Sequence, residues 1–286
     1  MSLTIIEDAQ ALEERLSDSR DAGSRIGFVQ TMGALHEGHG SLVSAARAAA
    51  GVVVTSIFVN PLQFGPGEDL ERYPRTLAED QRYLEKLGCD ILYLPRAASM
   101  YPEGFATRVE MRGLTEVLCG RSRPGHFSGV LTVVLKLLHQ VRPHLAFFGE
   151  KDYQQYLVIR RMVRDLDLPI EIVPCATVRE SDGLALSSRN AYLSPEERAQ
   201  APAPRQALLA MNEAFLQGER GVPALLALGR EIIGRRPLVR IDYLEIRGSE
   251  DLAAREVEAL EGDLVAVAVF LGRTRLIDNL LLGSGA

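Results

Sequence analysis

Two histidines three residues apart are the most informative chemical feature of this sequence. His36 and His39 lie in the run HEGH, after the short apolar segment 26–29 and before the helix-like segment 41–50. A strand, a glycine-bearing loop and a helix N-terminus together form an anion site, because backbone N–H groups and the helix dipole point at the ligand. Histidines added to such a turn indicate triphosphate chemistry.

Zinc binding and simple solvation are the two competing interpretations of this pair. A zinc site would need at least one further His, Cys or carboxylate ligand, and the run is not the H-E-x-x-H pattern. An ordinary strand-to-helix turn with solvated histidines would need no other residue. Residues elsewhere in the chain must decide among these interpretations.

Cationic and hydroxyl side chains later in the chain could complete a nucleotide site. Lys151 follows the apolar run 145–148 and stands where a helix is expected to begin, so its ammonium would add to the positive end of that dipole. Residues 187–189 read SSR and would add hydroxyls and a guanidinium. Each also has an ordinary interpretation: a solvated lysine, a serine helix cap, and an ion pair between Arg189 and Asp182.

The overall composition argues against several classes of protein. The formal net charge of −6 opposes attraction of the whole surface to nucleic acid or an anionic membrane. The 3 cysteines are widely spaced and form no C-x-x-C pair, which opposes a disulfide framework. The acidic N-terminus does not resemble a signal peptide, and no apolar run is long enough to span a bilayer. We expect a cytoplasmic protein that binds its anions locally, without nucleic-acid or membrane partners.

The order of apolar segments predicts the fold class. Roughly the first 175 residues alternate strand-like and helix-like segments, as in a parallel sheet covered by helices. Short apolar runs suited to burial on both faces predict strands at 27–29, 52–59, 91–94, 145–148 and 170–174. Helical patterns lie between them at 41–50, 77–87, 129–141 and 153–165. We therefore predict an α/β fold with a Rossmann-like parallel sheet and helices on both faces.

The polar loops of this predicted sheet should meet at one edge. Right-handed crossovers place every loop that follows a strand on the same edge, where ligands of open α/β sheets bind. The loops 31–39, 60–67 and 149–152 are the unusual, polar parts of the sequence. Residues that are distant in sequence should thus converge at one cleft.

The composition changes after residue 195, which indicates a second domain. Prolines punctuate helical stretches rich in Ala and Leu, and the runs 239–246, 264–270 and 275–282 predict strands whose short connections favour antiparallel pairing. We predict a Rossmann-like domain at residues 1–176 and a smaller α+β C-terminal domain at residues 177–286, with the linker near 176–190.

Five segments of the chain resemble one enzyme family. They read QTMGALHEGH at 30–39, SIFVNPLQFG at 56–65, GRSRPGHFSG at 120–129, FGEKDYQQ at 148–155 and DGLALSSRN at 182–190. In their order and spacing along nearly the whole chain, they closely resemble the pantothenate synthetases. Any one of these segments alone would be a weak signal, but the combination is specific.

This resemblance implies an ATP-dependent ligase of the HIGH-motif nucleotidyltransferase superfamily, related in its nucleotide site to class I aminoacyl-tRNA synthetases. Family members activate pantoate with ATP as pantoyl adenylate, release pyrophosphate, and then join the pantoyl group to β-alanine to give pantothenate and AMP. They need Mg²⁺ with ATP and are typically homodimers. The run HEGH would be the HIGH element, and SSR would stand in the place of KMSKS. Residues 1–176 would bind nucleotide and pantoate, and residues 177–286 would form a lid.

The resemblance also implies roles for individual residues. The catalytic donors and cations would be His36, His39, Lys151, Ser187, Ser188 and Arg189. ATP would bind these residues and also Met32, Gly149, Asp152, Val178 and Leu186. Pantoate has a carboxylate, hydroxyls and a gem-dimethyl group, and it would contact Gln63, Gln155, Met32 and Asn60.

The metal ligand and the flap stay open at this stage. The family places a metal-binding acid near Glu79 and Asp80, and Asp80 is the candidate. Acids on a helix surface are the simpler interpretation of that pair. Arg121, Arg123 and His126 would belong to an ordered flap or merely to a cationic loop.

Two positions depart from the family pattern. Gln30 stands where the family usually has proline, and Gly40 replaces the usual bulky apolar residue after the second histidine. Neither side chain is one that the chemistry requires. The departures therefore concern the stiffness of the HEGH loop rather than the reaction.

Two other functions compete with the ligase. A nucleotidyltransferase that couples ATP to a phosphorylated acceptor would need strong sites for the acceptor phosphate in place of the paired glutamines. A non-catalytic ATP-binding regulator would not need both histidines, Lys151 and the SSR segment.

Overall fold

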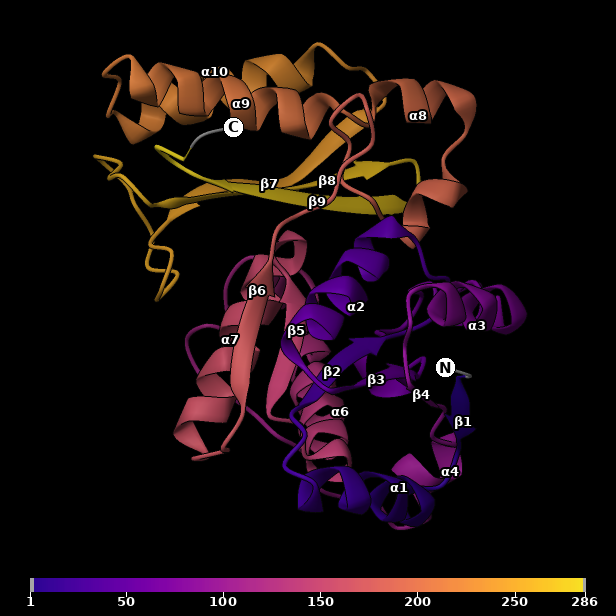
Figure 1. The fold of residues 1–286 in the computed structure, drawn as a ribbon. Helices are drawn as coiled ribbons and strands as arrows, with labels where there is room; N and C mark the ends of the chain where they lie inside the picture. The colour runs from indigo at the N-terminus through magenta and orange to yellow at the C-terminus, as the bar shows by residue number, and fades with distance from the viewer. Residues whose placement is uncertain (1–2, 285–286) are drawn as a thin grey trace. The chain divides into compact units, whose positions relative to one another are not determined.

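The structure of the protein, a computed structural model, describes residues 3–284, and these form two compact units (Figure 1). The first unit comprises Met1–Thr115, Arg123–Glu150 and Gln154–Ala176. The second comprises Glu116–Ser122, Lys151–Tyr153 and Thr177–Ala286. Two short segments from the N-terminal part of the chain therefore belong to the second unit.

A six-stranded parallel sheet forms the centre of the first unit, with the strand order β1-β4-β3-β2-β5-β6. Its strands are β1 (Thr4–Ile6), β2 (Ile26–Thr31), β3 (Val52–Ile57), β4 (Ile91–Tyr93), β5 (Leu145–Gly149) and β6 (Glu171–Cys175). The associated helices are α1 (Ala9–Asp21), α2 (Glu37–Ala49), the 3-10 turn η1 (Pro61–Gln63), α3 (Leu77–Lys86), α4 (Ala97–Met100), α6 (His126–Val141) and α7 (Tyr153–Asp165). The predicted α/β class with a parallel sheet is confirmed.

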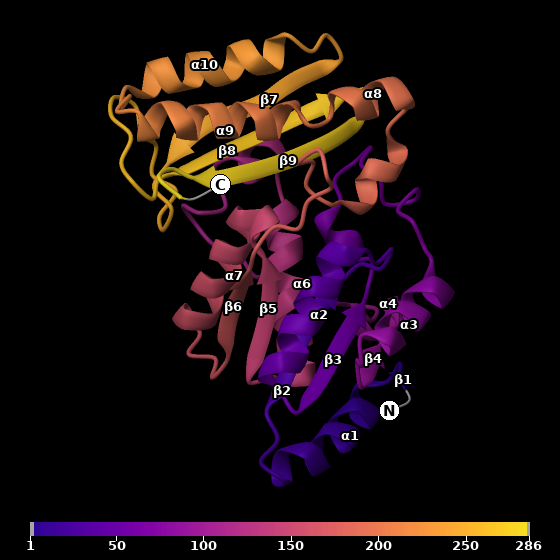
Figure 2. The same cartoon turned by 45° about the horizontal axis from the view of Figure 1, so that its top comes forward.

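Helices cover both faces of this sheet, as predicted (Figure 2). With this strand order, right-handed crossovers place α2 and α3 on one face and α1, α6 and α7 on the other. On the α2 face, Leu42 and Val43 pack with Val29, Val53 and Phe147 in one buried cluster. This packing fixes the start of α2 at the carboxyl edge of β2.

The N-terminal elements β1 and α1 were not predicted from the sequence. β1 has only 3 residues, of which Thr4 is polar and Ile5 is exposed, so it shows no buried apolar run, and it is defined by its parallel pairing with β4. Asp8 caps α1 by accepting hydrogen bonds from the backbone N–H groups of Gln10 and Ala11. This cap is a local signal that the sequence did contain.

Gln30, which departs from the family pattern, lies inside strand β2 and not in a loop. It pairs in register with Ser56 of β3, and β2 has β5 on its other side. Gln30 Oε1 and Ser56 Oγ are both buried and have no hydrogen-bond partner among residues 3–284. An unsatisfied buried polar group costs about 1–3 kcal/mol. Pairing with β3, rather than a proline, keeps this position stiff.

The second unit contains a three-stranded antiparallel sheet, order β7-β8-β9, covered on one face by two helices. Its elements are α5 (Cys119–Ser122), η2 (Glu150–Asp152), η3 (Ser188–Tyr192), α8 (Pro195–Gln200), α9 (Ala203–Leu216), α10 (Val222–Gly234), β7 (Val239–Arg247), β8 (Leu264–Leu271) and β9 (Thr274–Leu281). The predicted antiparallel α+β arrangement is confirmed. The predicted linker 176–190 contains a hairpin, in which Arg179 bridges Ala185.

Among residues 3–284, no helix is both long enough and apolar enough to cross a membrane.

Candidate active site

Residues 36–39, called here the histidine turn, form the beginning of α2. His36 is the N-cap, and its Nδ1 accepts the backbone N–H of Gly38 at 3.2 Å. His39 Nδ1 accepts the backbone N–H of His36 at 3.3 Å. The two imidazoles thus form a capping box, a motif usually made by a hydroxyl and a carboxylate. The sequence placed HEGH in a loop, but its last three residues lie in the first helical turn.

These hydrogen bonds fix the tautomer of both rings. A nitrogen that accepts a hydrogen bond carries no proton, so each neutral imidazole carries its proton on Nε2. The ring centroids are 4.1 Å apart and the ring planes meet at 36°. Two Nε2–H donors therefore lie at the positive end of the α2 dipole, where an anion is favoured.

Asp80 of α3 holds the backbone that leads into the histidine turn. Its carboxylate oxygens accept the N–H groups of Ala34 at 3.0 Å and Leu35 at 2.8 Å. The Thr76 hydroxyl donates to the same carboxylate at 3.2 Å. Gly33 and Ala34 are both in the left-handed region, with φ of 86° and 50°, which is unfavourable for alanine. The buried carboxylate stabilises this turn.

These contacts do not fit the metal role that the resemblance gives Asp80. A carboxylate has about four acceptor positions, and three of those of Asp80 are already occupied. Its neighbour Glu79 pairs with the exposed Arg82 at 3.4 Å. No group of three or more His, Cys, Asp or Glu side chains that could hold a metal occurs within residues 3–284. The donor set therefore fits neither zinc at the histidines nor a protein cage for magnesium.

Gln63 is held in place by its neighbours from both ends of its carboxamide. Asn60 Nδ2 donates to Gln63 Oε1 at 3.1 Å, and Gln63 Nε2 donates to Met32 Sδ at 3.1 Å. Asn60 also donates to the Gly129 carbonyl and accepts from the Tyr101 hydroxyl at 2.7 Å. The structure thus brings Met32, Asn60 and Gln63, three of the candidate pantoate residues, into contact. The side-chain amide and oxygen of Asn60 are both hydrogen-bonded within the protein.

A close backbone contact between α6 and η1 lies behind Gln63. A methyl group built on Gly129 would overlap the Leu62 carbonyl and lie 2.6 Å from the Gln63 nitrogen. Only glycine allows this approach. Burial raises the pKa of Tyr101 to about 12, so its hydroxyl remains a donor to Asn60 at neutral pH.

Arg123 and His126 also support Gln63. His126 Nδ1 lies 2.9 Å from the Gln63 carbonyl oxygen, and Arg123 donates to the same oxygen at 3.3 Å. Arg123 forms a two-point ion pair with Glu68, at 2.8 Å and 2.6 Å. Burial alone would raise the pKa of Glu68, but the hydrogen bond and charge of Arg123 outweigh it and lower that pKa. Arg123 and His126 therefore order the loop after β3.

Gly149 and Gln155 complete the candidate residues of the first unit. Gly149 ends β5, and no heavy atom lies within 4 Å of a methyl group built on it, so its surroundings are open. Gln155 lies in the first turn of α7 and is half-buried. Its carboxamide forms no hydrogen bond with the part of the chain that the structure describes. The adjacent Gln154, in contrast, is buried and donates to the Leu114 carbonyl at 2.8 Å.

The second unit carries Lys151 and Asp152. Their side chains form an ion pair at 3.6 Å, and the lysine side chain is 21% exposed. Asn279 of β9 donates to the Lys151 carbonyl at 2.9 Å, which fixes the backbone of η2 in this unit. Lys151 thus lies in a 3-10 turn just ahead of α7, close to the helix start that the sequence predicted.

The other candidates of the second unit lie around the hairpin 178–186. The Leu186 N–H donates to the Val178 carbonyl at 3.0 Å, so these two predicted ATP residues are adjacent. Ser187 caps η3 by accepting the Arg189 N–H at 3.3 Å. Asp182, the partner considered for Arg189, forms its ion pair with Arg198 at 2.6 Å. That ion pair lowers the pKa of Asp182.

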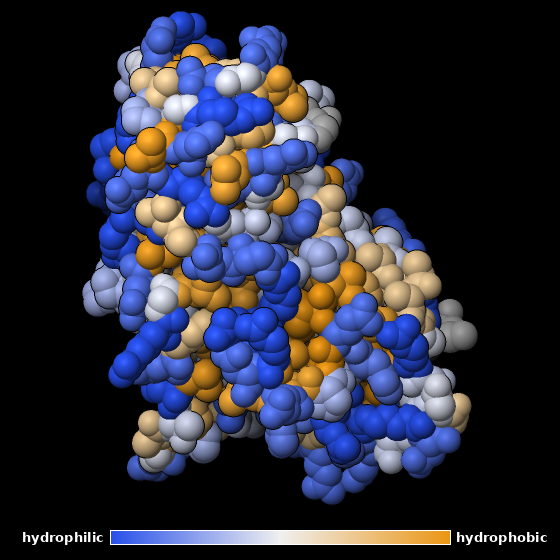
Figure 3. All heavy atoms as spheres, turned by 90° about the vertical axis from the view of Figure 1, so that its left-hand side faces the viewer, coloured by the Kyte–Doolittle hydropathy of each residue, from blue (hydrophilic) through white to orange (hydrophobic). Residues whose placement is uncertain are grey.

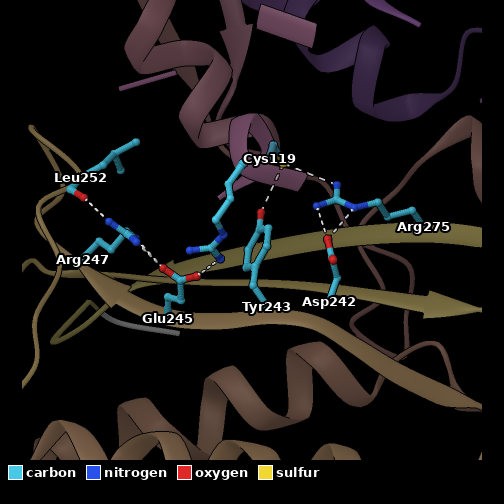
Figure 4. A network of polar contacts seen from close by, with 8 residues as sticks. Cys119, Asp242, Tyr243, Glu245, Arg247, Leu252 and Arg275 are labelled. Carbon is cyan, nitrogen blue, oxygen red and sulfur yellow. Dashed lines mark hydrogen bonds and ion pairs between the residues drawn. The ribbon is translucent and has the colours of Figure 1, made fainter. Parts of the chain in front are cut away.

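Arg121 belongs to a polar network on the sheet of the second unit, in which Figure 4 shows Cys119, Tyr243 and Arg275 lying close together. Its guanidinium pairs with Glu245 on β7. Nearby, the Cys119 thiol lies 3.2 Å from the Tyr243 hydroxyl, and Arg275 donates to the same sulfur at 3.5 Å. Burial raises the pKa of Tyr243, which keeps its hydroxyl protonated. This network attaches α5 to β7 and gives Arg121 a structural role.

Several supporting residues were missed because their partners lie far away in sequence. Tyr101 is 41 residues from Asn60, Glu68 is 55 from Arg123, and Asn279 is 128 from Lys151. None of them belongs to a recognisable motif. Only the glycine of Gly129, inside an otherwise apolar helix, gave a hint of close approach.

Comparison with known proteins gives a consistent result. A family model described as Pantoate-beta-alanine ligase matches residues 4–281. The pantothenate synthetase of Pseudomonas fluorescens (strain Pf0-1) is 53% identical, with 98% of each chain covered. That of Carboxydothermus hydrogenoformans is 52% identical over 96% of this chain and 97% of the relative.

Two crystal structures of such enzymes are similar over nearly the whole chain. The pantothenate synthetase of Thermus thermophilus has a TM-score of 0.93 and 50% identity, covering 98% of this chain and 99% of the other. The pantoate-β-alanine ligase of Francisella tularensis, complexed with β-γ ATP and β-alanine, has a TM-score of 0.80 and 34% identity, with 99% of each chain covered.

The pair of Glu68 and Arg123 predicts a pH-dependent contribution to stability. Because the folded-state pKa of Glu68 is lowered, its stabilisation is present above the unfolded pKa of about 4.3 and is lost as pH falls through the folded pKa. Glu68→Gln should therefore destabilise the protein by about 1 kcal/mol at pH 7, and by less at pH 3.5. Urea unfolding at both pH values measures this. Glu79 forms an exposed ion pair with Arg82, so Glu79→Gln is the control, and we expect little change in its free energy of unfolding. An equal loss of stability for Glu68→Gln at both pH values would contradict the role of this ion pair.

Proposed function

The chain belongs to the pantoate-β-alanine ligase family, and we propose that it joins pantoate to β-alanine through a pantoyl adenylate. In the first step a pantoate carboxylate oxygen attacks the α-phosphorus of ATP, and the bond to pyrophosphate breaks. In the second step the amine of β-alanine attacks the acyl carbon, AMP leaves, and the nitrogen loses a proton. The observation that carries this proposal is the histidine turn, whose capping bonds place the proton of each imidazole on Nε2.

The residues of the nucleotide site have defined chemical tasks. A carboxylate must approach a tetra-anionic nucleotide, so the site must offset repulsion and then stabilise charge that moves onto pyrophosphate. His36 and His39 donate to phosphate oxygens from a helix N-terminus. Lys151, Ser187, Ser188 and Arg189 supply the remaining charge and hydroxyl donors. Backbone and side-chain contacts to the nucleoside would come from Met32, Gly149, Asp152, Val178 and Leu186.

Pantoate is bound in this proposal by Gln63 and Gln155, beside the apolar surface of Met32. Two supports exist for this placement: Gln63 is oriented by internal hydrogen bonds, and the Gln155 carboxamide has none to the described residues. Asn60 takes a positioning role, because both of its amide hydrogens are already donated within the protein, whereas Gln63 Nε2 donates only to Met32 Sδ among the described residues. Residues 1–176 would thus bind pantoate and nucleotide, and residues 177–286 would serve as the lid domain.

Magnesium enters in this proposal as the complex with ATP, held by phosphate oxygens. No resident magnesium cage fits the described residues, and Mg²⁺ bound to nucleotides needs few protein carboxylates. The relative from Francisella tularensis was crystallised with β-γ ATP and β-alanine, so β-alanine is the amine we assign to the second step. A cytoplasmic location follows from this biosynthetic role.

A homodimer is supported by the exposed edge of the first unit's sheet. β6 is an edge strand, and its Ile172 and Val173 are partly exposed. Figure 3 views the side on which β6 and α7 lie in Figure 1 and shows hydrophobic side chains gathered there. Unpaired edges with apolar side chains favour association.

We expect a second copy of the chain to cover this edge. Sedimentation velocity should give a dimer for the wild type, and Ile172→Lys should shift it toward the monomer, because a charge would be buried. A monomeric wild type at micromolar concentration would contradict the proposal.

The adenylate mechanism predicts pantoate-dependent exchange of labelled pyrophosphate into ATP in the absence of β-alanine. The first half-reaction alone should be reversible, because it forms a bound intermediate and pyrophosphate. Exchange that requires β-alanine, or that ignores pantoate, would refute this mechanism. Exchange supported by an acceptor that carries a phosphate would favour the rival nucleotidyltransferase, and ATP binding without exchange would favour a regulator.

Lys151 and Gln155 should separate the two substrate sites kinetically. Lys151→Ala should lower kcat of the exchange by roughly 100-fold, as for other preorganised transition-state donors, with little change in the pantoate KM. Gln155→Ala should raise the pantoate KM about fivefold, equivalent to one hydrogen bond of about 1 kcal/mol, with kcat nearly intact. Each variant is the control for the other. Equal effects of both on kcat would show that the roles are misassigned.

A further inference from the structure

A tyrosine from α3 occupies the space where a side chain at position 40 would be. A methyl group built on Gly40 would overlap the hydroxyl oxygen of Tyr83 and lie 3.0 Å from its Cζ and 3.3 Å from its Cε1. Gly40 is buried and directly follows His39. The sequence departure at position 40 therefore has a structural counterpart, since the phenol ring fills the volume that the glycine leaves.

The first turn of α2 is intrinsically weak. Gly38 and Gly40 flank His39 within it. Glycine loses more conformational freedom on folding than any other residue, so two glycines in one turn favour fraying. Yet the imidazole nitrogens must keep their capping geometry if the Nε2–H groups are to point at a phosphate. Order must be supplied from outside this turn.

α3, which packs against α2, supplies that order at two points. Asp80 and Tyr83 are three residues apart on α3 and therefore share a face. Asp80 holds the N–H groups of residues 34 and 35, ahead of the histidine turn. Tyr83 contacts Gly40, behind it. Burial, and secondly the charge of Glu37, raise the pKa of the Tyr83 phenol, consistent with its place beside the first turn of α2.

We propose that Tyr83 is a positioning residue for His36 and His39 in adenylate formation, acting in place of the side chain that is absent at position 40. This inference rests on the proposed function. Tyr83 touches no reacting atom; it limits the motion of the Gly40 backbone and so holds His39 Nδ1 on its capping N–H. A loose turn would keep ATP within reach but misdirect the two donors.

The test uses four variants: Tyr83→Ala, Gly40→Leu, the double variant, and Arg82→Ala. Arg82 lies next to Tyr83 on α3, but it is exposed and its ion pair is with the equally exposed Glu79, so it is the matched control. Pantoate-dependent exchange gives kcat and KM, thermal unfolding gives Tm, and nitrogen NMR of the imidazoles reports the protonated ring nitrogen of His36 and His39.

Tyr83→Ala should lower kcat about tenfold, less than the roughly 100-fold that a 1 Å misplacement can cost, with the pantoate KM within about twofold. Gly40→Leu alone should also lower kcat, because the leucine and the phenol compete for one space. The double variant should recover to within about threefold of wild type, since leucine fills the volume from α2 itself. Arg82→Ala should match wild type.

Wild-type kcat in Tyr83→Ala, or a double variant as slow as the two single effects multiplied, would overturn the inference. If Tyr83→Ala does not fold, Tyr83→Phe decides it through the same comparison with and without Gly40→Leu. The imidazole spectra separate this inference from the proposed function. Absence of exchange in the wild type would refute the function alone, whereas unchanged His39 signals in Tyr83→Ala would refute the positioning role alone.

Discussion

The first turn of a helix leaves backbone N–H groups without partners. The side chains that cap these groups in α2 also orient the histidines of the candidate site. In most proteins a hydroxyl and a carboxylate would serve as caps. Here His36 and His39 do so through Nδ1. The same bonds that satisfy the helix N-terminus set the tautomer of the two imidazoles, on which their proposed role in catalysis depends. A change that loosens the cap changes the direction of both Nε2–H donors.

A second constraint sets the position of Asn60 and Gln63, which lie after β3. The backbones of α6 and η1 come so close at Gly129 that no side chain fits between them. This contact lets Asn60 reach the Gly129 carbonyl while it holds Gln63. Arg123 and His126, at the start of α6, then hold the Gln63 carbonyl from the other side. Gln63 therefore owes its orientation in part to residues at least sixty positions away in sequence.

The secondary-structure elements that contain buried apolar runs could be predicted from the sequence. The hydrogen-bond and ion-pair partners of individual side chains could not. The segments of β2, β3, β4 and β5 were predicted because each is an apolar run buried in the sheet. β1 lacks such a run, since Thr4 is polar and Ile5 is exposed, and its pairing with β4 defines it. The motif residues were found, but not their contacts. The resemblance implied a metal role for Asp80, but the sequence did not show that its carboxylate accepts backbone N–H groups. An ion pair with Asp182 was one interpretation of Arg189, and Asp182 pairs with Arg198. Charge type can be read from a sequence, but the choice among nearby partners of opposite charge is made by tertiary packing.

The hydrogen-bond capacity left on each polar side chain gives a physical criterion for sorting the candidates. Asn60 donates both of its amide hydrogens, to Gln63 and to the Gly129 carbonyl, so it can orient other residues but has no N–H left for a substrate. Gln63 Nε2 makes one donation among the described residues, to Met32 Sδ, and keeps a second N–H. Gln155 is the opposite case to Asn60, because its carboxamide is half-buried and forms no hydrogen bond with the described residues. The adjacent Gln154 instead donates to a backbone carbonyl. A half-buried polar group has already lost part of its hydration, so a substrate group that pairs with it gains a bond at reduced desolvation cost. By this criterion the hydrogen bonds of the protein itself separate Gln155, which we propose binds pantoate, from Asn60, which we propose positions Gln63.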